Sequence, residues 1–245
     1  MGKIVAIGGG EVRDLETLSI DQEIVFLTGK DHPRALFIPT ASNDAAGYCQ
    51  TFKEIYGEKL GCQTDELLLW SNTLSPTEIE RKIKEVDLIY VGGGNTQRML
   101  KKWRELDVDK MLIEAYKKGT VMSGLSAGSI CWFEYGHSDS KRFSGEADWH
   151  YIRVRGLGLI PGIHCPHVHH ESREESFEQS IKRKGGVGVA LDNCTALEVV
   201  DGKYRIITSQ GEPKAYKVYK KNGTVITEDI PAIAEFQPLA QLFIK

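Results

Sequence analysis

A serine between two glycines, at residues 124–128, has the residue types and spacing of a nucleophile. The segment reads Gly124-Leu125-Ser126-Ala127-Gly128 and directly follows a short apolar run. In a G-x-S-x-G pattern the serine lies on a sharp turn from a strand into a helix, which exposes its hydroxyl at the sheet edge. The helix that follows directs its first N–H groups toward the site, so the Ala127 amide can donate to an oxyanion. These residues predict acyl-transfer chemistry at Ser126.

A second glycine-rich turn can supply another oxyanion donor. The segment Val91-Gly92-Gly93-Gly94-Asn95-Thr96 ends a second expected strand and begins a helix, so its amides should emerge at the same sheet edge as Ser126. A plain strand-to-helix turn and a phosphate-binding loop are the alternatives. The phosphate interpretation is weaker, because G-x-G-x-x-G is absent and no G-K-[S/T] follows.

A serine nucleophile needs a base, and histidine is the usual one at neutral pH. Four of the seven histidines crowd into the segment GIHCPHVHHESREE: His164, His167, His169 and His170. A metal site built from His167, His169, His170 and Glu171 is the competing hypothesis. Alternate side chains of an extended segment point apart and H-E-x-x-H is absent, so we expect no metal and assign one of these histidines as the base.

The elements that must position these groups alternate between apolar strands and helical patterns. Strands are expected at residues 3–9, 34–42, 65–70, 87–95, 120–128 and 156–162, and helices at 44–60, 76–86 and 95–119, the last broken near Leu106-Asp107. This alternation predicts an α/β fold with a mostly parallel, doubly wound sheet. After residue 190, the turn pairs Asp201-Gly202 and Asn222-Gly223 predict β-hairpins that extend the sheet.

Length and composition set the remaining limits. The chain has 245 residues, and because no linker or repeat is visible we expect a single domain over residues 1–245. The 31 basic and 34 acidic residues give no electrostatic reason to expect nucleic acid or an anionic membrane as a partner. The apolar N-terminal run is too short for a signal peptide and no run could span a bilayer, which favours the cytoplasm. Five widely spaced cysteines without a CxxC pair predict reduced, mostly buried thiols.

Taken together, these segments resemble the serine peptidase family of peptidase E (aspartyl dipeptidase) and cyanophycinase, family S51. The similarity runs through most of the chain, in IGGG, FIPTAS, YVGGGNT, GLSAGS, GLGLIPG and CPHVHHESREE. It implies a fold of the flavodoxin-like, class I glutamine amidotransferase type, in which serine takes the role of the amidotransferase cysteine.

The resemblance also implies roles for individual residues. Ser126 would be the nucleophile, His167 the base, and the amides of Gly93 and Ala127 the oxyanion donors. Family members complete the triad with an acidic residue, whereas here the matching position is Asn193, beside Asp192. An asparagine can orient the imidazole without stabilising its charged form, and Asp192 can do both if its loop turns inward, so both stay candidates. The remaining acids are Asp139, expected to line the site and bind the substrate's amino terminus, and Glu198, expected to face solvent.

Substrate binding is the last expectation from the resemblance. Arg173 lies where the family has an arginine that pairs with the substrate's N-terminal aspartate; the alternative is a helix-face arginine paired with Glu174 or Glu178. Asn95 is a further substrate-binding candidate. The implied enzyme is a cofactor-free serine peptidase that cleaves short peptides, with N-terminal aspartyl dipeptides as the expected substrates. A cyanophycinase-like or isoaspartyl peptidase, a catalytically silent binding protein, a nucleotide-binding protein and a homodimeric assembly all stay open.

Overall fold

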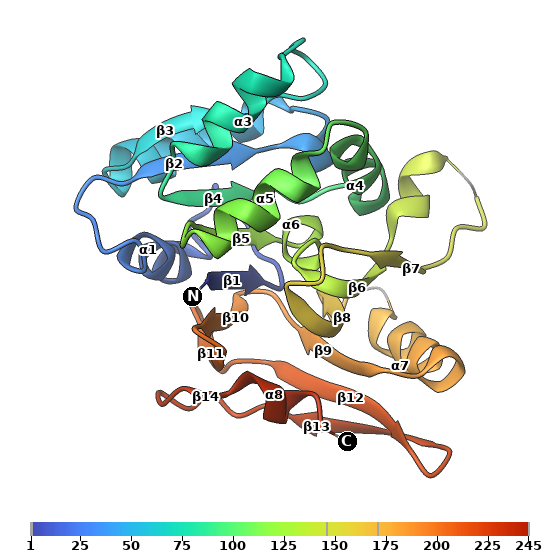
Figure 1. Ribbon diagram of the computed structural model, residues 1–245. Coiled ribbons are helices and arrows are strands. Elements are labelled where there is room, and N and C mark those ends of the chain that lie inside the picture. Colours follow the sequence, from blue (N-terminus) through green and yellow to red (C-terminus); the bar gives the residue numbers. More distant parts are fainter. Residues whose placement is uncertain (1, 146, 171, 245) are drawn as a thin grey trace.

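The computed structural model describes residues 2–145, 147–170 and 172–244 and contains two β-sheets in an α/β arrangement (Figure 1). The larger sheet has the strand order β14-β11-β10-β1-β5-β4-β2-β3. Its strands β1, β5, β4, β2 and β3 are parallel, and β10, β11 and β14 continue one edge in antiparallel pairing. The bounds are β1 Lys3–Ile7, β2 Arg34–Ile38, β3 Gln63–Glu66, β4 Leu88–Val91, β5 Val121–Leu125, β10 Thr195–Val200, β11 Lys203–Thr208 and β14 Gln237–Pro238.

The smaller sheet has the order β13-β12-β9-β8-β6-β7, with β6, β8 and β9 parallel at its centre. Its strands are β6 Phe133–Ser138, β7 Ile152–Arg155, β8 Ile160–Pro166, β9 Val187–Leu191, β12 Ala215–Lys221 and β13 Thr224–Asp229. Both predicted hairpins are present, with positive φ at Asp201-Gly202 and Asn222-Gly223. Only the first hairpin extends the main sheet, because β10 pairs with β1, whereas the second hairpin joins the smaller sheet through the pairing of β12 with β9. The chain therefore changes sheets at residues 192–194.

Helices cover both faces of the larger sheet, as the alternation of strands and helices predicts. Alternate strand residues face opposite ways: Ile4 and Ile89 pack with α3, α4 and α5, whereas Val5 and Tyr90 pack with α1 and α2. The helices are α1 Leu18–Phe26, α2 Ala46–Phe52 with a π-helical continuation Lys53–Lys59, α3 Pro76–Lys84, α4 Thr96–Glu105, α5 Val108–Lys117, α6 Ala127–Ile130, α7 Arg173–Lys184 and α8 Leu239–Leu242. Helix α1 was not expected from the sequence.

Local chemistry explains several element ends. Asp107 has φ 55° at the predicted break between α4 and α5, and Ser75 with Glu78 forms a capping box on α3. Three expected strands are wrong in part. Strand β2 ends at Ile38 rather than residue 42, and Thr40–Ser42 form a 3-10 turn. Strand β3 ends at Glu66 rather than residue 70, where the Asp44 carboxylate accepts from the amides of Trp70 and Ser71. Residues 156–159 form a loop before β8.

All five cysteines are unpaired and buried. Across residues 2–145, 147–170 and 172–244, none of the helices is both long and apolar enough to span a bilayer.

Candidate active site

Ser126 lies on a strained turn between β5 and α6. Its backbone has φ 57° and ψ −110°, a conformation that costs about 1–3 kcal/mol for a residue with a side chain. The flanking glycines make this turn possible: a β-carbon on Gly124 would lie 2.3 Å from the Gly128 carbonyl oxygen, and one on Gly128 would lie 2.0 Å from that of Val91. The two glycines of the G-x-S-x-G pattern are therefore required by packing, as the sequence indicates.

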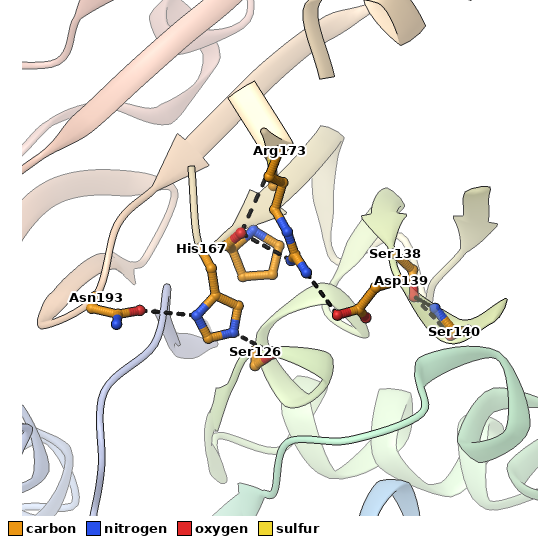
Figure 2. A network of polar contacts seen from close by, with 9 residues as sticks. Ser126, Ser138, Asp139, Ser140, His167, Arg173 and Asn193 are labelled. Atoms are coloured by element: carbon orange, nitrogen blue, oxygen red, sulfur yellow. Dashed lines mark hydrogen bonds and ion pairs between the residues drawn. The ribbon is translucent and has the colours of Figure 1, made fainter. Parts of the chain in front are cut away.

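His167 contacts the Ser126 hydroxyl directly (Figure 2). Its Nε2 lies 2.6 Å from Ser126 Oγ, and its Nδ1 lies 2.9 Å from Oδ1 of Asn193. An amide oxygen can only accept, so with this amide orientation Nδ1 carries the proton and Nε2 is free to accept one from Ser126. Because His167 follows β8 and Asn193 follows β9, the smaller sheet positions both residues against a serine of the larger sheet.

The environment of His167 keeps its ring neutral. Burial, together with the positive charge of Arg173, lowers the pKa of His167 from 6.5 to about 4. A neutral imidazole at neutral pH can accept a proton, as a general base requires.

The third position is occupied by Asn193 and not by its neighbour. Asp192 accepts a hydrogen bond from Nδ1 of His169 at 2.8 Å and lies 3.8 Å from the Lys214 ammonium. Of the two candidates, Asn193 is the one that contacts His167, because the Asp192 carboxylate is engaged by His169 and Lys214. Cys194 follows with φ 60°, so the turn leaving β9 presents adjacent side chains in different directions.

The two expected oxyanion amides flank the serine. A β-carbon on Gly93 would lie 3.5 Å from Cβ of Ser126, which places this turn against the Ser126 side chain. Ala127 is the first residue of α6, so its N–H has no acceptor within the helix. The Gly93 N–H donates to the hydroxyl of Tyr48, at 3.4 Å. Tyr48 is a site residue that sequence reasoning missed, since an isolated tyrosine in an expected helix gives no signal.

Arg173 and Asp139 form an ion pair beside His167. Nη2 of Arg173 lies 2.7 Å from Oδ2 of Asp139, and its Nη1 donates to the carbonyl of Pro166 at 3.0 Å. Arg173 is only 3% exposed, so the alternative of a helix-face arginine paired with Glu174 or Glu178 is wrong. Two of its donor groups are engaged within the protein, and the Asp139 carboxylate accepts from it.

The side chains of Asn95 and Glu198 are both engaged by other groups of the protein. The Asn95 side chain caps α4 by accepting from the Arg98 amide at 3.0 Å, and it donates to the Ser140 carbonyl at 3.3 Å. It is not among the described residues lining the cavity, so its expected contact with substrate is not supported. Glu198 is fully buried and accepts from Arg205 at 2.6 Å, contrary to the expected solvent-facing position.

The other clustered histidines do not converge. His164 is buried, and its Nδ1 contacts the Val189 carbonyl while its Nε2 lies 2.8 Å from the Ser129 hydroxyl. His167 is therefore the histidine of this cluster that contacts the Ser126 hydroxyl. His169 contacts Asp192, and His170 lines the cavity. Glu171 lies outside the described residues. Within the described residues, no three His, Cys, Asp or Glu side chains are grouped to hold a metal ion.

An open cavity of about 650 Å³ gives access to Ser126. This volume is typical of sites for small molecules. Its charged lining carries both signs: Arg13, Arg142 and Arg173 on one hand and Glu11, Glu16 and Asp139 on the other. The lining also includes Gly10, which ends the IGGG motif, and residues of the loop 11–16 that follows it; no motif in this loop predicts that position.

A serine on a strained strand-to-helix turn, with a neutral histidine on its hydroxyl, places the protein among α/β hydrolytic enzymes with the geometry of a serine nucleophile. Comparison with known proteins narrows the class. Residues 4–207 match the model of peptidase family S51, and the chain belongs to this family.

One relative by sequence and two solved structures illustrate the extent of the similarity. The chain is 37% identical over 222 residues to the uncharacterized peptidase YgaJ of Bacillus subtilis, covering 89% of this chain and 92% of that protein. The crystal structure of a peptidase from an acI-B1 Actinobacterium superposes with a TM-score of 0.71 at 17% identity, covering 97% of each chain. A solved structure from Listeria monocytogenes EGD-e gives a TM-score of 0.60 at 20% identity, over 94% of this chain and 99% of that one. The two structures confirm the α/β fold.

Proposed function

We propose that this protein is a serine peptidase that cleaves short peptides, with N-terminal aspartyl dipeptides as its main substrates, through Ser126, His167 and Asn193. The observation that carries the proposal is the chain of contacts from Asn193 Oδ1 to His167 Nδ1 and from His167 Nε2 to Ser126 Oγ, at 2.9 and 2.6 Å. Membership of a peptidase family supports the same chemistry.

The first half-reaction forms an acyl-enzyme. His167 takes the hydroxyl proton of Ser126 as Oγ attacks the peptide carbonyl carbon, and the carbonyl electron pair moves onto oxygen. The Ala127 amide donates to this oxyanion, and the Gly93 amide does so once the oxyanion replaces the Tyr48 hydroxyl as its acceptor. The intermediate then collapses, the C–N bond breaks, and the imidazolium returns its proton to the leaving amine.

Water completes the reaction by the same route. His167 takes a proton from water as the water oxygen attacks the ester carbon, and the second collapse breaks the bond to Oγ. The imidazolium proton returns to Oγ, which regenerates Ser126 and releases the carboxylate product.

The charges of the cavity fit a small zwitterionic substrate with an acidic side chain. Since two donor groups of Arg173 are engaged internally, Arg13 is the arginine of the lining that we assign to the carboxylate of the substrate's acidic side chain. Glu11 and Glu16 line the same cavity and suit the substrate's ammonium group. Arginine pairs with carboxylates through two parallel N–H donors, which favours aspartate over neutral residues.

The test is amine release from α- and β-aspartyl dipeptides and neutral dipeptides, measured for the wild type and Ser126→Ala. Cleavage of α-aspartyl dipeptides by the wild type alone is the expected result. Preference for the β-linked set would replace the proposal by an isoaspartyl or cyanophycinase-like activity. Equal activity of Ser126→Ala, with its fold intact by circular dichroism, would refute the role of Ser126.

A catalytically silent binding protein is the second candidate, and the neutral Asn193 favours it. An asparagine leaves the imidazolium without a neighbouring negative charge at Nδ1, which weakens the base. A serine-directed fluorophosphonate separates the two candidates, because it reacts only with an activated serine. Labelling of the wild type at Ser126 supports the enzyme, and its absence supports the silent protein.

A further inference from the structure

Arg173 connects Pro166, the residue before His167, to Asp139 at the end of β6. It is the first residue of α7, and its guanidinium donates to the carbonyl of Pro166 and to the carboxylate of Asp139, at 3.0 and 2.7 Å (Figure 2). The ring of Tyr151 lies 4.9 Å from the guanidinium carbon. With its side chain 4% exposed, Arg173 has little surface to offer a ligand.

The loop held by Arg173 is strained at the base. Pro166 directly precedes His167, whose φ is 130°, a region that residues with a side chain rarely adopt. Such a conformation persists only where surrounding contacts impose it. The His167 amide donates to the Leu191 carbonyl at 3.1 Å, and the Pro166 carbonyl, on the other side of the same peptide bond, accepts from Arg173.

Asp139 is itself held in place. It follows β6 directly, between Ser138 and Ser140, whose hydroxyls lie 2.7 Å apart. The Ser140 hydroxyl also accepts from the Gln97 amide of α4 at 2.9 Å, which ties this turn to the larger sheet's helices. The Asp139 carboxylate, which accepts the hydrogen bond from Arg173, therefore belongs to a turn fixed by hydrogen bonds.

We propose that Arg173 and Asp139 are positioning residues that hold His167 against Ser126, and that neither binds the substrate's aspartyl side chain. This inference rests on the proposed function of Ser126 and His167. Lysine cannot replace Arg173, because one ammonium on a flexible stem does not reproduce two N–H donors fixed in a plane. Loss of this brace, defined as the Arg173–Asp139 pair with its bond to Pro166, displaces the base without touching substrate.

The first experiment measures the rate at which a small, uncharged fluorophosphonate labels Ser126 in Arg173→Lys and Asp139→Asn. The probe carries no carboxylate, so loss of a substrate-binding arginine would leave its rate unchanged. We expect the rate to fall about 100-fold in Arg173→Lys, in line with the cost of misplacing a reacting group by about 1 Å, and less in Asp139→Asn. Asp139→Asn also keeps the test available if Arg173→Lys does not fold.

Arg205→Lys is the matched control. Arg205 also bridges two acceptors, Glu198 and Glu23, but it lies on β11 and is not among the described residues of the cavity. The rate at which Ser126 is labelled in Arg205→Lys should equal that of the wild type. A fall as large as that in Arg173→Lys would mean that losing any such bridge slows the serine, and would overturn the brace.

Crystal structures of the two site variants give a readout that does not depend on activity. We expect the distance from Ser126 Oγ to His167 Nε2 to lengthen in Arg173→Lys, from 2.6 Å to beyond hydrogen-bonding range. An unchanged distance and labelling rate, with a raised KM for acidic peptides alone, would overturn it and return Arg173 to substrate binding. If the wild type is not labelled, the proposed function fails, and the crystallographic distance still decides the brace.

Discussion

Gly9 lies so close to Asn193 that a β-carbon at this position would be 2.1 Å from the asparagine Oδ1 and 2.3 Å from Nδ1 of His167. The hydrogen bond that orients the imidazole therefore runs past a backbone that must carry no side chain. The glycine run after β1 contributes to the site in this way, in addition to ending the strand.

Gly9→Ala should separate His167 from Asn193. We expect kcat/KM to fall about 100-fold, because the methyl group occupies the space of the hydrogen bond. Gly57→Ala is the control, since a β-carbon there would make ordinary contacts of 3.5 Å with Thr64. Peptide hydrolysis and thermal melting of both variants check this, and an active Gly9→Ala enzyme would contradict the importance of the Asn193 contact.

Asn193→Asp should raise activity. The present amide already holds His167 in the tautomer that accepts from Ser126, so the substitution adds mainly a charge beside the imidazolium. A hydrogen bond to a charged group is worth roughly 1 kcal/mol more than a neutral one, which corresponds to about a fivefold gain in kcat. Asp192→Asn serves as the control because Asp192 contacts His169 instead, and its kcat should stay near that of the wild type.

The pH dependence of activity should have an unusually low acidic limb. The proposed mechanism needs neutral His167, whose pKa is lowered to about 4 by burial and by Arg173. The ring is neutral above this pKa, so kcat/KM should rise as pH increases through about 4 and be level from about 5 to 7. A limb near pH 6.5 in a pH–rate profile would show that the ring is more hydrated than its surroundings indicate.

The pair of buried Glu198 and half-buried Arg205 should contribute to stability and not to catalysis. Arg205→Met leaves a fully buried carboxylate without its partner, which costs about 3–5 kcal/mol of unfolding free energy. Arg81→Met removes an exposed pair with Glu85 and should cost less than about 1 kcal/mol. Urea unfolding measures both. Equal losses for the two variants would mean that Glu198 is solvated or protonated once Arg205 is removed.

The strained turn at Ser126 could be predicted from sequence because its signal is local. Ser126, Gly124 and Gly128 lie within five residues, and the turn they form depends on their own backbone. The hairpin turns at Asp201-Gly202 and Asn222-Gly223 were predictable for the same reason, since both residues of each pair need positive φ.

What the sequence could not show depends on contacts between distant segments. Arg173 and Asp139 are 34 positions apart, and their pairing follows from how α7 packs beside β6. The choice between Asp192 and Asn193 depends on the direction in which one turn presents two adjacent side chains, which no spacing rule fixes. Tyr48 reaches the Gly93 amide through a fold contact across 45 positions.

The chain passes from β9 in the smaller sheet to β10 in the larger one. As a result, the reactivity of the Ser126 hydroxyl can report whether the two sheets have packed together. The serine comes from the larger sheet and the imidazole from the smaller one, so neither sheet alone contains a reactive pair. During refolding, the appearance of fluorophosphonate reactivity would mark the moment at which the two sheets dock. Helical circular dichroism that recovers before this reactivity would reveal an intermediate with both halves formed but not yet joined.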